Sequence, residues 1–144
     1  MRLIYSRSRT PFGLLVRAAS WWGQWSHCGI VTGDGTVIHA HALRGVVEEP
    51  LPEFAKRYSL HALVDVSAPN DDIGIAWARE RIGDGYDYGG IVRYISRKLS
   101  DHSPRRWSCA ELVETALTAA GCVRWRCEPH EVTPHQSYIA RAAL

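Results

Sequence analysis

The stretch that decides the fold is residues 26–41, SHCGIVTGDGTVIHAH, which predicts two strands joined by a tight turn. The segments Ser26–Val31 and Thr36–His41 are rich in apolar and β-branched residues, which favour extended structure. Glycines on either side of Asp34 mark the turn between them. The sequence therefore predicts a hairpin that carries three histidines.

The length of the hairpin loop decides which of these histidines share a face of the sheet. A two-residue turn would put His27 and His39 on opposite faces, because side chains alternate along a strand. An odd-length loop instead places His41 opposite His27, with His39 diagonally beside it on the same face. We predict the odd-length loop, with Gly33 or Gly35 at a positive φ angle.

A second informative stretch, residues 107–113, WSCAELV, predicts the start of a helix. Ser108 is a good N-cap, and Glu111 stands three residues later, as in a capping box. Apolar residues then recur at helical spacing until Gly121. Cys109 falls in the first turn, where the helix dipole and backbone N–H groups favour a thiolate. A small buried hydrophobe is the alternative interpretation of this cysteine.

The order His27, His39, Cys109 resembles that of the circularly permuted papain-like hydrolases of the NlpC type. These include the YiiX-like bacterial proteins and, more distantly, lecithin:retinol acyltransferase. In the unpermuted cell-wall peptidases, the cysteine helix comes first and the histidine strands follow. Residues 86–90, YDYGG, are similar to the tyrosine and paired-glycine element before that helix. The resemblance covers residues 26 to about 113.

The resemblance implies Cys109 as nucleophile, His27 as general base and His39 as the residue that orients His27. Many YiiX-like proteins have glutamate where this chain has His39, and a neutral histidine stabilises an imidazolium less than a carboxylate does. His41 is therefore the alternative third residue. The Tyr86 hydroxyl and the backbone N–H of Cys109 would form an oxyanion hole, although Tyr86 also suits a packing role.

These roles imply attack by the thiolate on an acyl carbon and a thioester intermediate. By analogy with the unpermuted relatives, we expect a hydrolase that cleaves an amide bond in a peptidoglycan-type peptide. One alternative is a lipid-directed thioesterase or acyltransferase, which a deep apolar cleft would favour. Another is a non-catalytic binding or virion-structural module, in which Cys109 would be no more reactive than Cys122. The expected partner is a peptide or a small acyl-containing substrate.

We expect no cofactor and no metal. Zinc at Cys122, Cys127 and His130 is a minor alternative, because a fourth ligand is not evident in the sequence. A site made by the three hairpin histidines is the better metal alternative. The four cysteines do not require disulfides in a chain without an export signal.

Length and charge set further limits. The 144 residues suit one α+β domain, with an antiparallel sheet or small open barrel packed against a helical layer that carries Cys109. A net charge of +2 does not indicate nucleic-acid binding, and residues 124–126 and Glu114 are expected to face solvent. No apolar run is long enough to span a membrane, and the first residues lack the core of a signal peptide. We expect a cytoplasmic protein, or one delivered by a phage particle.

The remaining elements follow from periodicity. Trp21, Trp22 and Trp25 precede the first histidine strand, where aromatic residues are more often core than the lining of a cleft. A helix is expected over residues 12–22. Further strands are expected at residues 3–5, 44–48 and 60–66, and further helices at 52–57, 71–82, 90–99 and near the C-terminus.

Overall fold

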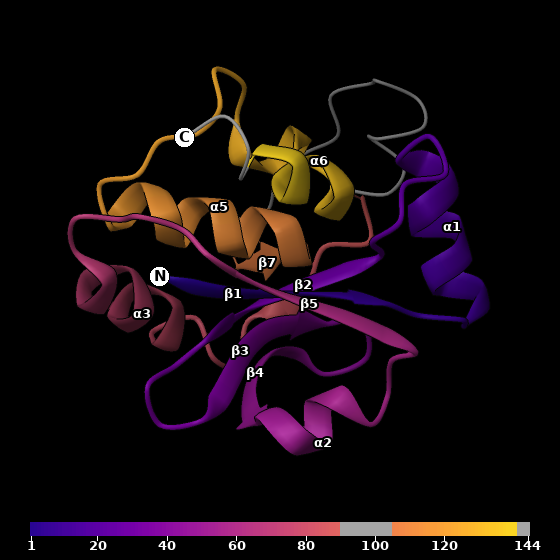
Figure 1. Cartoon of the computed structure of the whole chain (residues 1–144), viewed down its shortest axis with the longest axis horizontal. Helices are drawn as coiled ribbons and strands as arrows, with labels where there is room; N and C mark the ends of the chain where they lie inside the picture. Colours follow the sequence, from indigo (N-terminus) through magenta and orange to yellow (C-terminus); the bar gives the residue numbers. More distant parts are fainter. Residues whose placement is uncertain (90–104, 141–144) are drawn as a thin grey trace.

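The computed structural model describes residues 1–89 and 105–140, and its centre is a five-stranded antiparallel sheet (Figure 1). The strand order is β4-β3-β2-β1-β5, so neighbours in the sheet are mostly neighbours in the chain. The predicted α+β class is confirmed. The strands are β1 (Arg2–Arg7), β2 (His27–Val31), β3 (Thr36–His41), β4 (Gly45–Pro50) and β5 (Leu60–Asp65).

Helices cover both faces of this sheet. Helices α3 and α5 pack together over one face, and α2 covers the other face near β3 and β4 (Figure 1). None of the described helices is long and apolar enough to cross a membrane. The helix predicted over residues 90–99 lies outside the described residues. The helices are α1 (Pro11–Ala19), α2 (Leu51–Ala55), α3 (Asp71–Arg79), α5 (Cys109–Ala119) and α6 (Pro134–Ile139), with a 3-10 turn η1 (Pro129–Glu131).

Strand alternation divides the apolar residues between two cores. On β2 and β3, Cys28, Ile30 and Ile38 point toward α5, where they join Leu112 in the larger core. Val37 points the other way, into a smaller core beneath α2. Burying one such aliphatic side chain stabilises the fold by about 1.5–3 kcal/mol. Because side chains alternate, the histidines at positions 27 and 39 belong to the α2 face.

A short parallel pair connects the sheet to α5. Strands β6 (Gly85–Tyr86) and β7 (Arg106–Trp107) pair side by side, and β7 leads directly into α5. Gly45, at the start of β4, has φ +69, and a Cβ there would lie 2.0 Å from the Asp84 carbonyl oxygen. The close approach lets the N–H of Val46 donate to that oxygen at 2.8 Å. The segment before β6 is therefore fixed against the edge strand.

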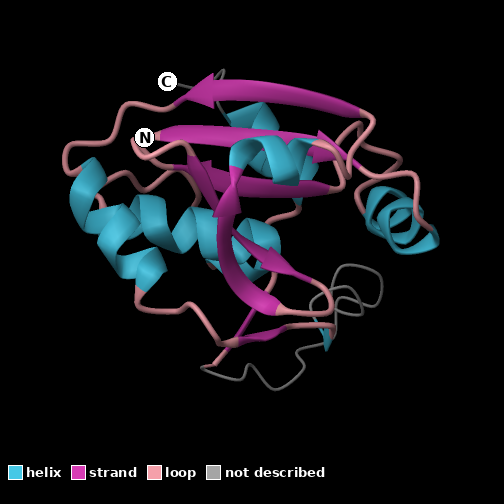
Figure 2. Ribbon diagram, turned by 90° about the horizontal axis from the view of Figure 1, so that it is seen from below, coloured by secondary structure: helices cyan, strands magenta, loops and turns pink. Residues whose placement is uncertain are grey.

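Helix α1 stands beyond one end of the strands (Figures 1 and 2). It ends at Ala19, earlier than predicted, because the backbone turns left-handed at Trp21 and Trp22. The expected core position is correct for Trp25, which is 2 % exposed. It is wrong for Trp21 and Trp22, which are 89 % and 69 % exposed.

Candidate active site

The β2–β3 hairpin has the register predicted for the odd-length loop. Ile30 pairs with Ile38 and Val31 with Val37 across the two strands. Gly35 has φ +76, so the expected positive φ lies at the second of the two candidate glycines. This register puts the histidines at positions 27 and 39 on one face of the sheet.

His27 and His39 form a direct hydrogen bond. Nε2 of His27 lies 2.9 Å from Nδ1 of His39, and the two rings are nearly perpendicular. Gly29 lies on the same face beside them, where a Cβ would come within 3.0 Å of the Cβ of His39. Burial lowers the pKa of His39 far below its ordinary value, with the charge of His27 as the next cause. His39 is therefore a neutral imidazole.

A carboxylate determines the tautomer of His39. Its Nε2 lies 2.7 Å from Oε1 of Glu49, and an ionised carboxylate can only accept a hydrogen bond. The proton of His39 is therefore on Nε2, and its Nδ1 accepts a hydrogen bond from the Nε2–H of His27. Nδ1 of His27 is then the ring nitrogen left to take a proton from a nucleophile.

Glu49 is a site residue that the sequence interpretation missed. It pairs with Val37 across β3 and β4, while His39 pairs with Val47, so Glu49 stands diagonally beside His39 on the same face. Arg44 donates to Oε2 of Glu49 at 2.8 Å, and Arg57 makes an ion pair with Oε1. The strand predicted over residues 44–48 ended one residue before Glu49. Continuing the alternation of its side chains by one residue would have identified this carboxylate.

Aromatic rings from the α2 segment hold the imidazole of His27. The Tyr58 ring stacks on His27 at 5.3 Å between centroids and an interplanar angle of 11°. Phe54 stacks at 5.8 Å and also meets the edge of His39. Burial raises the pKa of the Tyr58 hydroxyl, which stays protonated at neutral pH. These contacts limit rotation of the His27 ring.

Cys109 lies at the first position of α5, behind the predicted capping box. Ser108 Oγ accepts from the N–H of Glu111, and the Glu111 carboxylate accepts from the N–H of Ser108. The pKa of Cys109 is lowered well below its ordinary value, first by a hydrogen bond from Cys28 and then by the charge and hydrogen bond of His27. His27 and Cys28, the first two residues of β2, both act on Cys109, so its sulfur lies near the start of this strand.

Cys28 is the second residue that the sequence interpretation missed. Burial raises its pKa well above the ordinary value, and the nearby Cys109 raises it further. Cys28 therefore remains a thiol that can donate its S–H to the sulfur of Cys109. Its position next to His27, on the face that packs against α5, is the signal in the sequence.

His41, the alternative third residue, has a different set of contacts. Its Nδ1 accepts the N–H of Leu43 at 3.1 Å, and its ring is 6.0 Å from that of His39. Partial burial lowers the pKa of His41 to about 4, and the charge of Arg44 contributes. The structure thus brings His27 together with His39. His41 instead lines the edge of the cleft that opens beside His27.

A largely apolar cleft of about 360 Å³ opens beside His27. Tyr86 lines it and packs edge-on against Phe12 at 5.8 Å and Tyr88 at 5.1 Å. Cys109 is 3 % exposed and does not line this cleft, whereas His27 does. Of the predicted residues 86–90, Gly90 lies outside the described residues.

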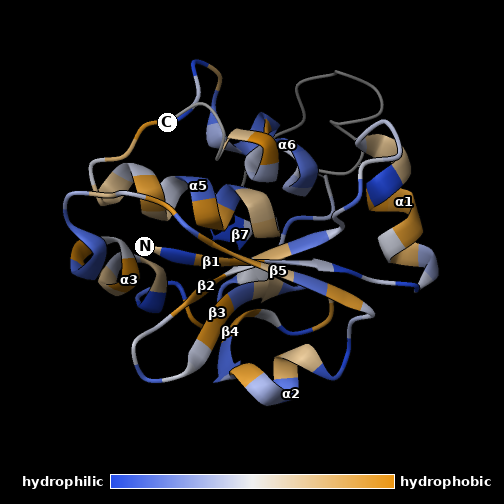
Figure 3. Cartoon of the chain, in the orientation of Figure 1, coloured by the Kyte–Doolittle hydropathy of each residue, from blue (hydrophilic) through white to orange (hydrophobic). Residues whose placement is uncertain are grey.

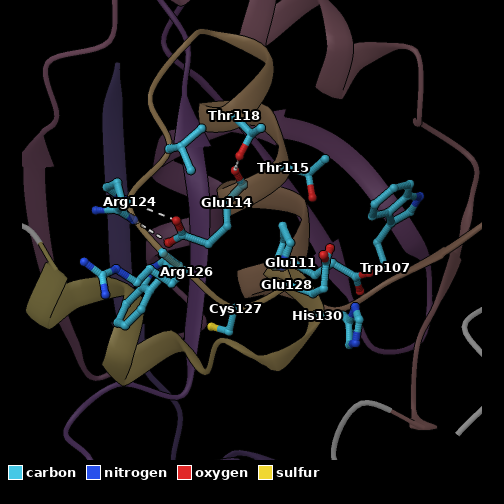
Figure 4. Close-up of a pocket in the computed structure, with 13 residues that line it drawn as sticks. Trp107, Glu111, Glu114, Thr115, Thr118, Arg124, Arg126, Cys127, Glu128 and His130 are labelled. Carbon is cyan, nitrogen blue, oxygen red and sulfur yellow. Dashed lines mark hydrogen bonds and ion pairs between the residues drawn. The ribbon is translucent and has the colours of Figure 1, made fainter. Parts of the chain in front are cut away.

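A second cavity of about 600 Å³ lies on the outer side of α5 (Figure 4). Glu114 and Arg124, both expected to face solvent, point toward each other here and form a buried ion pair. Ser137 Oγ donates to Glu114 at 2.5 Å. The prediction is wrong for Glu114 and Arg124, whose side chains are 3 % and 1 % exposed because they pair with each other, and correct for Arg126, which is exposed.

Neither metal alternative has the arrangement of a metal site. Both ring nitrogens of His39 already bond protein atoms, namely those of His27 and Glu49. Cys127 and His130 line the outer cavity, whereas Cys122 belongs to the core. Within residues 1–89 and 105–140, no three or more His, Cys, Asp or Glu side chains are grouped so as to hold a metal ion.

Comparison with known structures finds the same fold elsewhere. The chain is similar to the metalloprotein YiiX from Escherichia coli O157:H7, with a TM-score of 0.51 and 17 % sequence identity. The match covers 85 % of this chain and 67 % of YiiX. No family model matches the sequence, and no curated protein matches it. At this identity the likeness concerns the fold alone, which is YiiX-like.

Proposed function

We propose that this YiiX-like chain is a cysteine hydrolase in which Cys109 attacks an acyl carbon and His27 acts as its base. The observation that carries the proposal is the chain of hydrogen bonds from Glu49 through His39 to His27, together with the lowering of the Cys109 pKa by the charge of His27. A neutral His39 that lies between a carboxylate and the proposed base can orient His27 while His27 takes up a proton and releases it again.

The proposed reaction has two steps. The thiolate of Cys109 attacks the carbonyl carbon, the bond to the leaving group breaks, and His27 protonates that group as it departs. A thioester results. His27 then removes a proton from water, which attacks the thioester, releases the carboxylic acid and restores the thiol. The backbone N–H of Cys109 and the Tyr86 hydroxyl are the proposed donors to the oxyanion.

The resemblance to NlpC-type enzymes favours the amide bond of a peptidoglycan-type peptide as the target. A second candidate, a lipid-directed thioesterase or acyltransferase, is favoured by the apolar lining of the cleft. Phe12, Leu43 and Tyr88 line it together with Tyr58 and Tyr86, and such a surface suits an acyl chain better than a polar peptide stem.

YiiX is described as a metalloprotein, and a metal does not fit the residues at this site. A metal would have to displace the hydrogen bonds that occupy both nitrogens of His39. The proposed reaction therefore includes no step at a metal.

The test is acylation of Cys109 by two substrate sets, short peptide amides and acyl thioesters of increasing chain length. Intact-mass spectrometry is expected to show an acyl adduct that is absent in Cys109→Ser and retained in Cys122→Ser. Faster acylation by longer chains supports the lipid-directed candidate, and faster acylation by peptides supports the amidase. No adduct from either set would leave the non-catalytic module as the better interpretation.

A further inference from the structure

The outer face of α1 is apolar and exposed. Gly13 and Val16 point inward, whereas Leu14 and Leu15 are 43 % and 44 % exposed. The chain then turns and presents Trp21 and Trp22, the first of them 89 % exposed. We call Leu14, Leu15, Trp21 and Trp22 the Trp patch; the apolar side of α1 is visible in Figure 3.

The turn that carries the two indoles is strained and firmly held. Trp21 and Trp22 have φ angles of 55° and 59°, a region that side chains other than glycine rarely adopt. Arg17 Nε donates to the Gly23 carbonyl at 2.9 Å, and Ser20 Oγ donates to the Val16 carbonyl at 2.9 Å. Folding gains little apolar burial from two rings held in water, so the strain indicates a role outside the fold.

The N-terminal stretch that carries the Trp patch has charges of one sign. Residues 1–33 contain four arginines and no acidic residue. Arg2 pairs with Asp65, while Arg7, Arg9 and Arg17 form no ion pair with another described residue. Arg9 is exposed immediately before α1. A surface that combines tryptophan with arginines that have no acidic partner among residues 1–89 and 105–140 complements an anionic, amphipathic partner.

We propose that the Trp patch docks the protein on the surface of a bilayer that contains anionic lipids. Indole rings favour the headgroup region, where the ring is apolar and its N–H can hydrogen bond. A second copy of the chain is less suited, since four side chains alone do not supply the ~800 Å² that each partner buries in a stable interface. Two protruding rings also fit a deformable lipid surface better than a rigid one.

Docking in this way would bring the cleft to the membrane. Thr10, Phe12 and Gly13, at the start of α1, line the cleft beside His27. The same helix therefore contributes to the Trp patch and to the site. The docking itself does not depend on Cys109, so its test stands whether or not the proposed reaction is correct.

The experiment is co-sedimentation of the full chain with vesicles of phosphatidylcholine and phosphatidylglycerol in equal parts, and with pure phosphatidylcholine. The test variant replaces Trp21 and Trp22 by Asn, which accepts a left-handed backbone and keeps the turn. Ile73→Gln, at an apolar residue of α3 that is 56 % exposed, is the matched control. We expect wild type and control to bind the anionic vesicles, and the double variant to bind at least about tenfold more weakly.

Added salt should weaken the binding of wild type, because it screens the arginines. Equal binding by wild type and the double variant would overturn the proposal, as would failure of wild type to bind either vesicle. Light scattering without lipid tests whether a second copy of the chain binds the Trp patch instead. A wild-type dimer that becomes a monomer in the double variant would assign the Trp patch to self-association. Cys109→Ser should bind vesicles like wild type, which separates docking from the reaction.

Discussion

Nε2 of His39 donates a hydrogen bond to Oε1 of Glu49 across 2.7 Å, with the imidazole fully buried and the carboxylate nearly so. Position 39 carries a histidine, and the carboxylate stands one residue further along the line of contacts, at Glu49. A neutral histidine in contact with a carboxylate can orient His27 and still stabilise an imidazolium at a distance.

Removing the charge of Glu49 should weaken the site without destroying it. In Glu49→Gln, His39 loses the partner that keeps its proton on Nε2, so alkylation of Cys109 by iodoacetamide should slow by several-fold. Glu48→Gln is the matched control, because Glu48 bonds Thr36 and Arg79 instead. ¹⁵N spectra of His39 provide the second readout, and an unchanged tautomer and rate would show that Glu49 has only a structural role.

Cys109 should be the most reactive thiol at neutral pH. Its pKa is lowered by Cys28 and His27, so its alkylation rate should rise with pH through a midpoint below the usual value of about 8.5. In His27→Ala the midpoint should move upward and selectivity over Cys127 should fall. Mass spectrometry locates the modified residue. Equal labelling of all four cysteines would contradict the proposed nucleophile.

Cys28→Ala should raise the pKa of Cys109, because the largest cause of its lowering is the hydrogen bond from Cys28. The alkylation profile should therefore shift to higher pH while the fold is retained, since alanine leaves only a small gap in the core. Cys122→Ala, at another buried cysteine, is the control and should leave the profile in place. A profile that stays unchanged in Cys28→Ala would leave His27 and the helix terminus as the causes.

Stability should fall as the pH drops below about 6.5. His41 has a pKa of about 4 in the folded chain, so the unfolded chain binds more protons between these two values. His41 should contribute on the order of 1 kcal/mol to this loss, since solvent screens this partly exposed ring, and the buried His39 adds to the loss in wild type and variant alike. His41→Asn, whose oxygen can accept the Leu43 N–H, should show a smaller loss between pH 7 and pH 4.5. Urea unfolding at both pH values measures it, and an identical loss in the variant would refute this role for His41.

Ser108→Ala should lower the free energy of unfolding by about 1 kcal/mol through loss of the N-cap. The same change should slow alkylation of Cys109, because the first turn that carries the sulfur frays. Thr133→Ala removes the N-cap of α6 and is the control for capping alone. If both variants alkylate like wild type, the cap stabilises the helix without positioning the thiol.

The parts that could be predicted from the sequence are those set by local periodicity. The odd number of residues in the hairpin loop determined which side chains of the hairpin share a face. The pair of Ser108 and Glu111 located the start of α5. The YiiX-like fold was anticipated by the resemblance, whereas the resemblance to NlpC-type enzymes themselves stays a prediction.

The parts that could not be predicted depend on contacts between distant segments. Glu49 reaches His39 through the pairing of β3 with β4, and Cys28 matters only because α5 packs against β2. Trp21 and Trp22 were expected in the core because large apolar rings are usually buried. Nothing in the local sequence marks a left-handed turn that keeps both rings in water.

The order of elements along the chain has a consequence for synthesis. Strands β1 to β5 lie within the first 65 residues, so a chain growing from its N-terminus can form the sheet, with His27, His39 and Glu49, before residue 109 is made. The sulfur of Cys109 is then made as part of α5, and it meets His27 only when this helix packs onto the finished sheet. An interrupted chain would therefore carry the proposed base without the proposed nucleophile, and the proposed reaction would require α5 to be folded.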